Sequence, residues 1–217
     1  MCVCVCVDVI ISATEEELVS KFLAFNEPIV FTAEKGCWPF LDGREGGEHI
    51  CENVYPPSST PYRFLNSGTW MGYAGPAREA LVKMMELPEA KEKAIDQELA
   101  SILFIQGNSG ITLDYNAEIF QSVHLSRDLL VLRDYHGAGD GDGDGDGDGD
   151  GDGAVKRWKN TATGTWPSVF HFNGNGKHSQ ALIETSFLHN LDYHSMLKPS
   201  AVEKITGLDF QEVCSTP

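Results

Sequence analysis

The stretch of sequence that decides the fold runs from Asp8 to Glu34 and reads DVIISATEEELVSKFLAFNEPIVFTAE. The middle of this stretch is helix-like and joins two apolar runs. These are Met1–Ile11, which begins before the stretch, and Ile29–Ala33, and their β-branched residues are typical of buried strands. Thr14 and Glu17 have the spacing of a capping box, which predicts a helix beginning just after Thr14. The apolar residues that follow keep the spacing of a buried helix face: Leu18, Phe22 and Phe25. Strand, helix and strand with short connections form a βαβ unit, so the sequence predicts an α/β fold with a parallel sheet.

Outward from this unit, the chain alternates between loops and short elements. Residues 34–63 are rich in Gly, Pro and Ser, which predicts an ordered loop of functional importance. Pro76 fits the first position of a helix ending near Leu87, and Asp96 can cap another helix over 97–106. Further strands are expected at 64–74, 111–120, 128–135, 155–159 and 168–172.

The charge of the chain argues against two classes of partner. The formal net charge is −16, and an acidic protein is repelled by nucleic acid and by anionic membrane surfaces. The sequence also lacks a run of about 20 apolar residues that could span a bilayer, and it lacks a signal-peptide pattern at its start. We therefore expect no nucleic-acid partner and no membrane span.

Seven of the negative charges lie in an alternating Asp-Gly tract between Gly139 and Gly153, and without them the net charge is −9. The tract separates two strand-like segments, so we expect a disordered insertion over 137–154 at the tip of a hairpin. The sequence predicts one domain over 1–180 that contains this insertion, followed by a helical or irregular tail over 181–217.

Cysteine usage does not indicate a disulfide scaffold, because six cysteines are few for 217 residues. Cys37 and Cys51 form the one plausible disulfide pair, and the sequence leaves open whether they are bonded.

Three segments combine rare polar residues with glycine or a helix start: 65–68 (LNSG), the pair Asp96-Gln97, and 171–177 (HFNGNGK). In the last segment, His171 at the end of a predicted strand provides an imidazole. Two glycines then allow the backbone to approach a ligand closely, and Lys177 follows. These groups suit a diphosphate bound with Mn²⁺ or another divalent metal, for which Asp8 is the obvious carboxylate ligand.

Together with their order along the chain, these segments resemble the glycosyltransferase domain of procollagen lysyl hydroxylases. That family has an Asp-x-x-Asp metal motif, a Phe-x-Ala-Glu strand, Cys-Trp-Pro, Arg-(Phe/Tyr)-Leu-Asn-Ser-Gly-Gly, Asp-Asp-Gln-Leu and His-Gly-Asn-Gly-Pro-Thr-Lys. The corresponding segments here are Asp8-Val9-Ile10-Ile11, Phe31-Thr32-Ala33-Glu34, Cys37-Trp38-Pro39, Arg63 to Gly68, Ile95 to Leu99 and His171 to Lys177. Leu113-Asp114-Tyr115 and Ile119-Phe120-Gln121 resemble the family's Leu-Asp-His and Ile-Phe-Gln signature, so the resemblance covers about residues 8–177.

The resemblance implies a GT-A-like, Rossmann-like domain that moves glucose or galactose from a UDP-sugar to a hydroxylysine-type or glycosyl-hydroxylysine acceptor such as collagen. Its implied metal ligands, for Mn²⁺ or another divalent ion, are Asp8 and His171. Its implied diphosphate-binding residues are Asn173, Gly174 and Lys177. Its implied catalytic pocket consists of Trp38, Asn66 and Asp96, with Asp96 as the catalytic carboxylate.

Two positions depart from the family pattern, since Val5 and Ile95 stand where the family has aspartates. The family domain also begins with a strand and loop that hold uracil and ribose, so we expect a domain that is incomplete at its N-terminus, with Met1–Val7 as a false start in the gene model. The resemblance further implies the secretory pathway, in particular the endoplasmic reticulum.

Two other functions remain open at this level. The departures at Val5 and Ile95 allow a non-catalytic glycan- or collagen-binding protein that keeps the pocket of Trp38 and Asn66. The Asp-Gly tract allows an acidic calcium-responsive protein, although the tract lacks the regular apolar residues of calcium-binding repeats.

Overall fold

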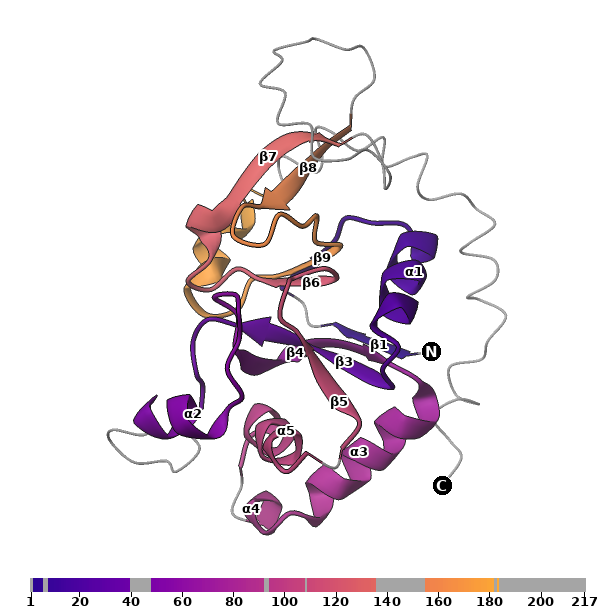
Figure 1. Cartoon of the computed structure of the whole chain (residues 1–217), viewed down its shortest axis with the longest axis vertical. Helices are drawn as coiled ribbons and strands as arrows, with labels where there is room; N and C mark the ends of the chain where they lie inside the picture. The colour runs from indigo at the N-terminus through magenta and orange to yellow at the C-terminus, as the bar shows by residue number, and fades with distance from the viewer. Residues whose placement is uncertain are drawn as a thin grey trace.

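The computed structural model describes residues 2–5, 8–39, 48–91, 94–107, 109–135, 155–181 and 183 (Figure 1). Nine strands form three sheets within these residues. The four-stranded sheet has the order β1 (Cys2–Val5), β4 (Phe64–Gly72), β3 (Ile29–Glu34), β5 (Ile111–Asp114). The three-stranded sheet has the order β2 (Val9–Ile11), β9 (Val169–His171), β6 (Phe120–Ser122), and β7 (Leu130–Tyr135) pairs with β8 (Val155–Asn160).

The predicted α/β class is confirmed, but the prediction of a parallel sheet is wrong. Parallel pairing occurs only between β3 and β5 and between β6 and β9 in the described part of the chain. Strand β4 lies between β1 and β3 and runs antiparallel to both. An antiparallel neighbour needs no crossover helix, so the long loop after β3 can return the chain directly as β4.

The helix of the opening unit forms as the sequence predicts. Helix α1 (Glu15–Phe25) begins after Thr14, whose side-chain oxygen accepts a hydrogen bond from the Glu17 N–H at 3.3 Å. It ends at Asn26, which adopts the left-handed conformation with φ of 52°. Leu18 and Phe22 are buried beneath it. The predicted first strand, however, is divided at Asp8, because β1 and β2 belong to different sheets.

The other helices cover the opposite face of the four-stranded sheet. They are α3 (Ala74–Glu86), the short α4 (Pro88–Lys91) and α5 (Asp96–Ile105), and Figure 1 shows them together on the side away from α1. Helix α2 (Glu48–Val54) lies inside the region predicted as a loop, where no helix was expected. The helix predicted from Pro76 begins two residues earlier, at Ala74.

Alternate residues of β3 face two different cores. Ile29, Phe31 and Ala33 pack with side chains of α3 and α5 on one face of the sheet. Val30 packs with Leu18 and Phe22 of α1 on the other face. This alternation places Glu34, the last residue of β3, on the same face as Val30 and toward the three-stranded sheet.

Strand β4 leaves its ladder with β3 for three residues. Phe31 pairs with Trp70 whereas the next residue, Thr32, pairs with Asn66, so residues 67–69 have no partner in β3. Bulges of this kind bend a strand and redirect its side chains, and they are frequent beside active sites. The bulge carries Ser67 and Gly68 toward other elements.

The predicted hairpin is confirmed by the antiparallel pairing of β7 and β8, from Leu130 with Asn160 to Tyr135 with Val155. The predicted insertion at 137–154, and with it the calcium-responsive alternative, lies outside the described residues. The predicted tail at 181–217 also lies outside them, apart from residues 181 and 183. Ile183 is fully buried and packs in a third apolar cluster with Phe170 and Phe172. Across the described residues, no helix is both long enough and apolar enough to cross a membrane.

Candidate functional site

The three polar segments singled out in the sequence meet at one buried carboxylate, Glu34. This residue is only 3% exposed. Its Oε1 accepts hydrogen bonds from Asn66 Nδ2 at 3.0 Å and from Gln97 Nε2 at 2.9 Å. Its Oε2 accepts one from Asn173 Nδ2 at 2.8 Å. Strand β4, helix α5 and the segment after β9 therefore each contribute one amide side chain to the same carboxylate.

The surroundings of Glu34 alter its protonation. Burial raises the pKa of the Glu34 carboxyl to about 7, against the opposing effect of its hydrogen bonds from Asn66, Gln97 and Asn173. Burial penalises the charged form, and each amide donor stabilises it. A carboxyl group poised near neutral pH inside a polar cluster is typical of functional sites.

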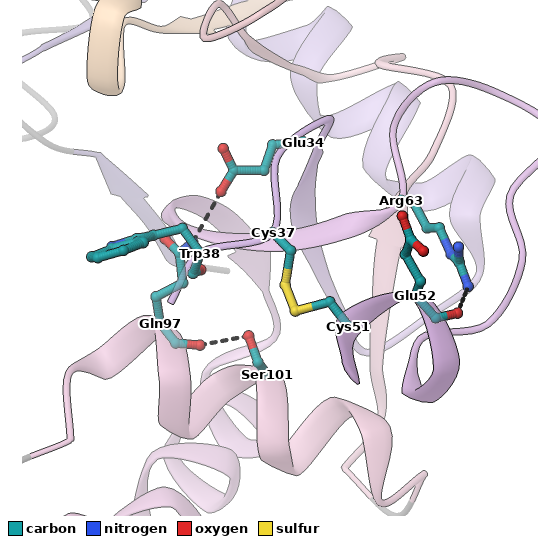
Figure 2. Close-up of a disulfide and its surroundings, with 8 residues drawn as sticks. All are labelled: Glu34, Cys37, Trp38, Cys51, Glu52, Arg63, Gln97 and Ser101. Atoms are coloured by element: carbon teal, nitrogen blue, oxygen red, sulfur yellow. Dashed lines mark hydrogen bonds between the residues drawn. A yellow bond between two sulfur atoms is a disulfide. The ribbon is translucent and has the colours of Figure 1, made fainter. Parts of the chain in front are cut away.

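Trp38 lies at the rim of this carboxylate–amide cluster. Its side chain is 60% exposed, and its backbone carbonyl accepts a hydrogen bond from Gln97 Nε2. Figure 2 shows the indole extending away from the adjacent disulfide, with Gln97 between Trp38 and helix α5. An exposed indole beside buried polar groups suits stacking against a sugar.

A disulfide fixes the chain next to Trp38. Cys37 is bonded to Cys51 of α2, with their Cα atoms 6.3 Å apart (Figure 2), so the pair whose bonding the sequence leaves open is a disulfide. Arg63 holds the far end of α2 by donating to the carbonyls of Glu52 at 2.6 Å and Tyr55 at 2.7 Å. The loop that carries Trp38 is thus fastened to the start of β4.

Asn66 and Asp96 are joined through the bulge of β4. Asn66 Oδ1 accepts from the Gly68 N–H at 2.9 Å. The Ser67 hydroxyl donates to Asp96 Oδ2 at 3.0 Å, and the Ser67 N–H donates to Gln97 Oε1 at 3.3 Å. The predicted capping role of Asp96 is wrong, because α5 starts at Asp96 itself and its N-cap is Ile95. The Asp96 carboxylate binds Ser67 instead of the amides of its own helix.

Asp8, His171 and Lys177 meet where β2 and β9 pair. His171 Nε2 is 3.5 Å from Asp8 Oδ1, and Lys177 Nζ is 3.5 Å from Asp8 Oδ2. The backbone locks this arrangement, since the Phe172 N–H donates to the carbonyl of Asp8 at 2.9 Å. Two residues separated by 163 positions in the chain are thereby brought into contact, as the metal prediction requires.

Gly68 is packed against the ring of His171. A Cβ atom at residue 68 would lie 2.1 Å from His171 Cε1 and 2.6 Å from Nε2, so a side chain here would force the imidazole to move. Gly68 also donates to Asn66, so it joins the carboxylate–amide cluster to the Asp8–His171 pair. Asn173 makes the same connection, because it binds Glu34 and lies two residues after His171.

The donor set at Asp8 and His171 fits a divalent metal. Burial lowers the pKa of the His171 imidazole, although Asp8 acts in the opposite direction, and a neutral ring is the form that ligates metals. His171 Nδ1 is a buried nitrogen without a hydrogen-bond partner among the described residues. Adjacent ligands of an octahedral ion with bonds of about 2.1 Å lie about 3 Å apart. The Nε2–Oδ1 distance of 3.5 Å is close to that value.

A third protein ligand is missing in this part of the structure. The described residues contain no group of three or more His, Cys, Asp or Glu side chains that could hold a metal. Mg²⁺ and similar ions are often held by one or two carboxylates together with waters and substrate phosphates. Asp8 and His171 therefore fit a metal that arrives with a phosphorylated ligand.

The predicted diphosphate-binding residues form a short 3₁₀ turn, Gly174–Ser179, next to this pair. Asn173 is turned inward, where its Oδ1 accepts from the Ser122 hydroxyl at 2.9 Å and from the His124 N–H at 3.2 Å. Gly174 has a φ of 48°, which favours glycine. The side chain of Lys177 is 63% exposed and can move toward an incoming anion.

Sequence reasoning missed Glu34, Gln97 and His124 as site residues. Glu34 could have been found because it is a carboxylate at the end of an otherwise apolar strand. Gln97 could have been found because it follows Asp96, which was predicted as a site residue. Nothing in the pattern indicated His124. A cavity of about 560 Å³ lies elsewhere, between the end of α1 and β5, and none of the predicted site residues lines it.

Comparisons with known proteins point to one family. A family model described as the PLOD GT domain matches residues 1–190. The chain is 31% identical to procollagen-lysine,2-oxoglutarate 5-dioxygenase 2 of Mus musculus over 175 residues, which are 79% of this chain and 20% of the mouse protein. It is 27% identical to the multifunctional procollagen lysine hydroxylase and glycosyltransferase LH3 of Homo sapiens over 171 residues, 77% of this chain and 19% of the human protein.

A viral relative matches a shorter region. The uncharacterized protein R699 of Acanthamoeba polyphaga mimivirus is 34% identical over 132 residues, which are 60% of this chain and 26% of the viral protein. The chain thus spans about a quarter or less of the length of each of these three relatives.

Proposed function

Since the chain belongs to the family of PLOD glycosyltransferase domains, we propose that it is a metal-dependent hexosyltransferase with a GT-A-like fold. Its donor is a UDP-sugar carrying glucose or galactose. Its acceptor is a hydroxylysine-type or glycosyl-hydroxylysine group of a collagen-like chain. Its cofactor is Mn²⁺ or another divalent ion.

The observation that carries this proposal is the convergence of Asn66, Gln97 and Asn173 on Glu34, beside the Asp8–His171 pair. Sugar transfer requires a polar pocket for hydroxyl groups next to a positively charged place for a diphosphate. The cluster supplies the first, since carboxylate and amide side chains are suited to sugar hydroxyls. A divalent ion held by Asp8 and His171 would supply the second together with Lys177, because the ion and the ammonium carry the positive charge.

At the diphosphate, Asp8 and His171 would hold the divalent metal. The bound ion would neutralise the negative charge that develops on the departing UDP. Lys177 then leaves its contact with Asp8 and donates to a phosphate oxygen, because its exposed ammonium can reach an incoming anion. Gly174 lets the backbone approach the phosphates closely.

At the sugar, Trp38 gives a stacking surface and Asn66 orients hydroxyl groups from its bond to Glu34. Asp96 acts as the catalytic carboxylate. Ser67 anchors Asp96 Oδ2, which fixes the position of Oδ1 for the proton of the acceptor hydroxyl. The rate would come mainly from orientation and from electrostatic stabilisation of the leaving group.

We place the protein in the secretory pathway. The disulfide between Cys37 and Cys51 supports this location, because disulfides persist in oxidising compartments such as the endoplasmic reticulum.

The test is calorimetric titration of the purified chain with UDP, with and without Mn²⁺, followed by an assay of UDP release from UDP-galactose and UDP-glucose with a hydroxylysine peptide. We expect Mn²⁺-dependent UDP binding, lost in Asp8→Ala and in His171→Ala. The matched control is Asp134→Ala, which removes an exposed carboxylate and should bind UDP as the unaltered chain does. UDP binding that is equal with and without Mn²⁺ would argue against the metal site.

Two observations favour a second function. Asp8 and His171 have no third ligand of the usual kinds in the described residues, and Ile95 stands beside Asp96 where the family has a second carboxylate. A glycan- or collagen-binding protein without turnover would need neither. Binding of glycosylated collagen peptides without UDP release from either sugar donor would favour this alternative.

A further inference from the structure

His124 lies between two glycine turns of the site, in the turn that follows β6. Its backbone N–H donates to Asn173 Oδ1 at 3.2 Å. Its ring nitrogen Nδ1 accepts a hydrogen bond from the backbone N–H of Asn175 at 3.2 Å. Both bonds go to the segment predicted to hold the diphosphate, and neither role is assigned by the family resemblance.

The glycines around His124 show how closely this segment packs on the ring. A Cβ atom at Gly174 would lie 2.8 Å from His124 Nδ1 and 3.1 Å from Cγ. A Cβ atom at Gly176 would lie 3.1 Å from the His124 backbone nitrogen. The turn over Gly174–Lys177 therefore packs directly against this ring and this backbone, with no room for a side chain at Gly174.

The opposite edge of the ring faces the turn that follows Glu34. A Cβ atom at Gly36 would lie 3.8 Å from His124 Cδ2 and 4.0 Å from Nε2, which is ordinary contact. One imidazole edge thus touches the segment after Glu34 while the other binds the 174–177 turn. The hydrogen bond at Nδ1 requires that Nδ1 carry no proton, so the neutral ring bears its proton on Nε2.

We infer that His124 is a positioning residue, whose Nδ1 holds the Gly174–Lys177 turn in the conformation that receives the diphosphate of the donor. This inference rests on the proposed function, and it adds a residue that the family motifs do not contain. His124 acts through the amide of Asn175 and does not need to touch the ligand itself. Loss of one such hydrogen bond corresponds to a roughly fivefold change in an equilibrium constant.

Three substitutions separate the hydrogen bond from the volume of the ring. In His124→Asn the side-chain oxygen takes the place of Nδ1, so the acceptor is kept. In His124→Gln the oxygen extends toward the place of Nε2, and in His124→Leu no acceptor remains. Asp128→Ala, a change at an exposed residue four positions after His124 and outside the 172–181 peptide, is the control.

Two measurements are needed. The first is amide hydrogen exchange of the peptide covering residues 172–181 in the ligand-free protein. The second is the dissociation constant of UDP in the presence of Mn²⁺. We expect His124→Leu and His124→Gln to exchange the Asn175 amide faster and to bind UDP about fivefold more weakly. His124→Asn should match the unaltered protein in both measurements within about twofold.

Three results would overturn the inference. Equal exchange in all variants would mean that Nδ1 does not hold the turn. Faster exchange with unchanged UDP affinity would mean that the bond is structural only. Equal weakening by His124→Asn and His124→Leu would assign the effect to ring packing. If the unaltered chain does not bind UDP, the proposed function fails, and the exchange measurement still decides whether His124 holds the turn.

Discussion

At the scale of single residues, the chemistry of this site depends on Glu34, a buried carboxylate with three amide donors. The donors come from residues 66, 97 and 173, and a carboxylate deprived of them would remain buried with a large desolvation penalty. None of the three contacts is local in the chain. Sequence patterns could therefore single out the separate segments, but they could not show that the segments share one partner.

Replacing Glu34 with Gln should remove a pH dependence of folding stability. The pKa of Glu34 is about 7 in the folded protein and 4.5 in the reference state, so the folded state binds more protons between these values. Stability is then greatest below pH 4.5 and falls as the pH rises through 7. We expect the free energy of unfolding to fall by about 2 kcal/mol from pH 5 to pH 8 through this residue.

Urea denaturation at pH 5, 6, 7 and 8 measures this slope. In Glu34→Gln the slope should be smaller by that amount, whereas Glu27→Gln, at an exposed position, should leave it unchanged. An identical slope in Glu34→Gln and in the unaltered chain would contradict the assignment.

Replacing Gly68 with Ala should disrupt the contact between Asp8 and His171, the two proposed metal ligands. The added methyl group would lie 2.1 Å from His171 Cε1, so the imidazole must move away from Asp8. We expect a loss of about 1–3 kcal/mol in unfolding free energy and a more than tenfold loss of Mn²⁺-dependent UDP affinity. Gly75→Ala is the control, since no atom lies within 4 Å of the Cβ position of this residue in α3. Unaltered UDP affinity in Gly68→Ala would show that His171 does not contribute to binding.

At the scale of elements, two departures from regular secondary structure determine where the site residues lie. The bulge of β4 turns Ser67 toward Asp96 and places Gly68 against His171. The disulfide fastens Cys37, the neighbour of Trp38, to α2. A regular strand and an unconstrained loop would have the same pattern of hydrophobic residues. Hydrophobic periodicity alone therefore predicts neither the bulge nor the disulfide.

Removing the disulfide should weaken both the fold and the site. The cross-link joins residues 14 positions apart, and for a loop of about 15 residues the entropy of the unfolded chain contributes about 3 kcal/mol. We expect Cys37→Ala/Cys51→Ala to lose about that much unfolding free energy and to bind UDP-sugar more weakly, because Trp38 is no longer held. Denaturation with and without reductant measures the first effect. The double variant should be insensitive to reductant, and equal stability of the two proteins would refute the expectation.

At the scale of the whole molecule, the sequence was sufficient for the features that depend on neighbours in the chain. The α/β class, the Thr14 cap of α1 and the hairpin around the Asp-Gly tract are local, and all three are present. The prediction of a parallel sheet was wrong because β4, after the long loop that follows β3, lies antiparallel between β1 and β3. The alternation of apolar and polar residues within a strand does not indicate which strand pairs with it. The capping role of Asp96 failed for the same reason, since its partner Ser67 lies 29 residues away.

Deleting residues 139–153 should change the charge of the molecule without changing its chemistry. The deletion removes seven aspartates and moves the formal net charge from −16 to −9. Because β7 and β8 pair up to Tyr135 and Val155, a short Gly-Ser linker can replace the tract. We expect the same melting temperature within a few degrees, the same UDP affinity and a higher isoelectric point. Loss of UDP affinity on deletion, or a calcium-dependent change in melting temperature that needs the tract, would favour the calcium-responsive alternative.

The route by which Glu34 acquires its donors also bears on how the protein is made. The carboxylate emerges from the ribosome early, Asn66 and Gln97 follow, and Asn173 comes last. A nascent chain that has been synthesised only to the end of β8 has its β3 and β4 strands but lacks one donor to Glu34 and the whole of the His171–Lys177 segment. The site is therefore completed only after β9 and the Gly174–Ser179 turn have been synthesised, and binding competence would report that nearly all of the described chain has folded.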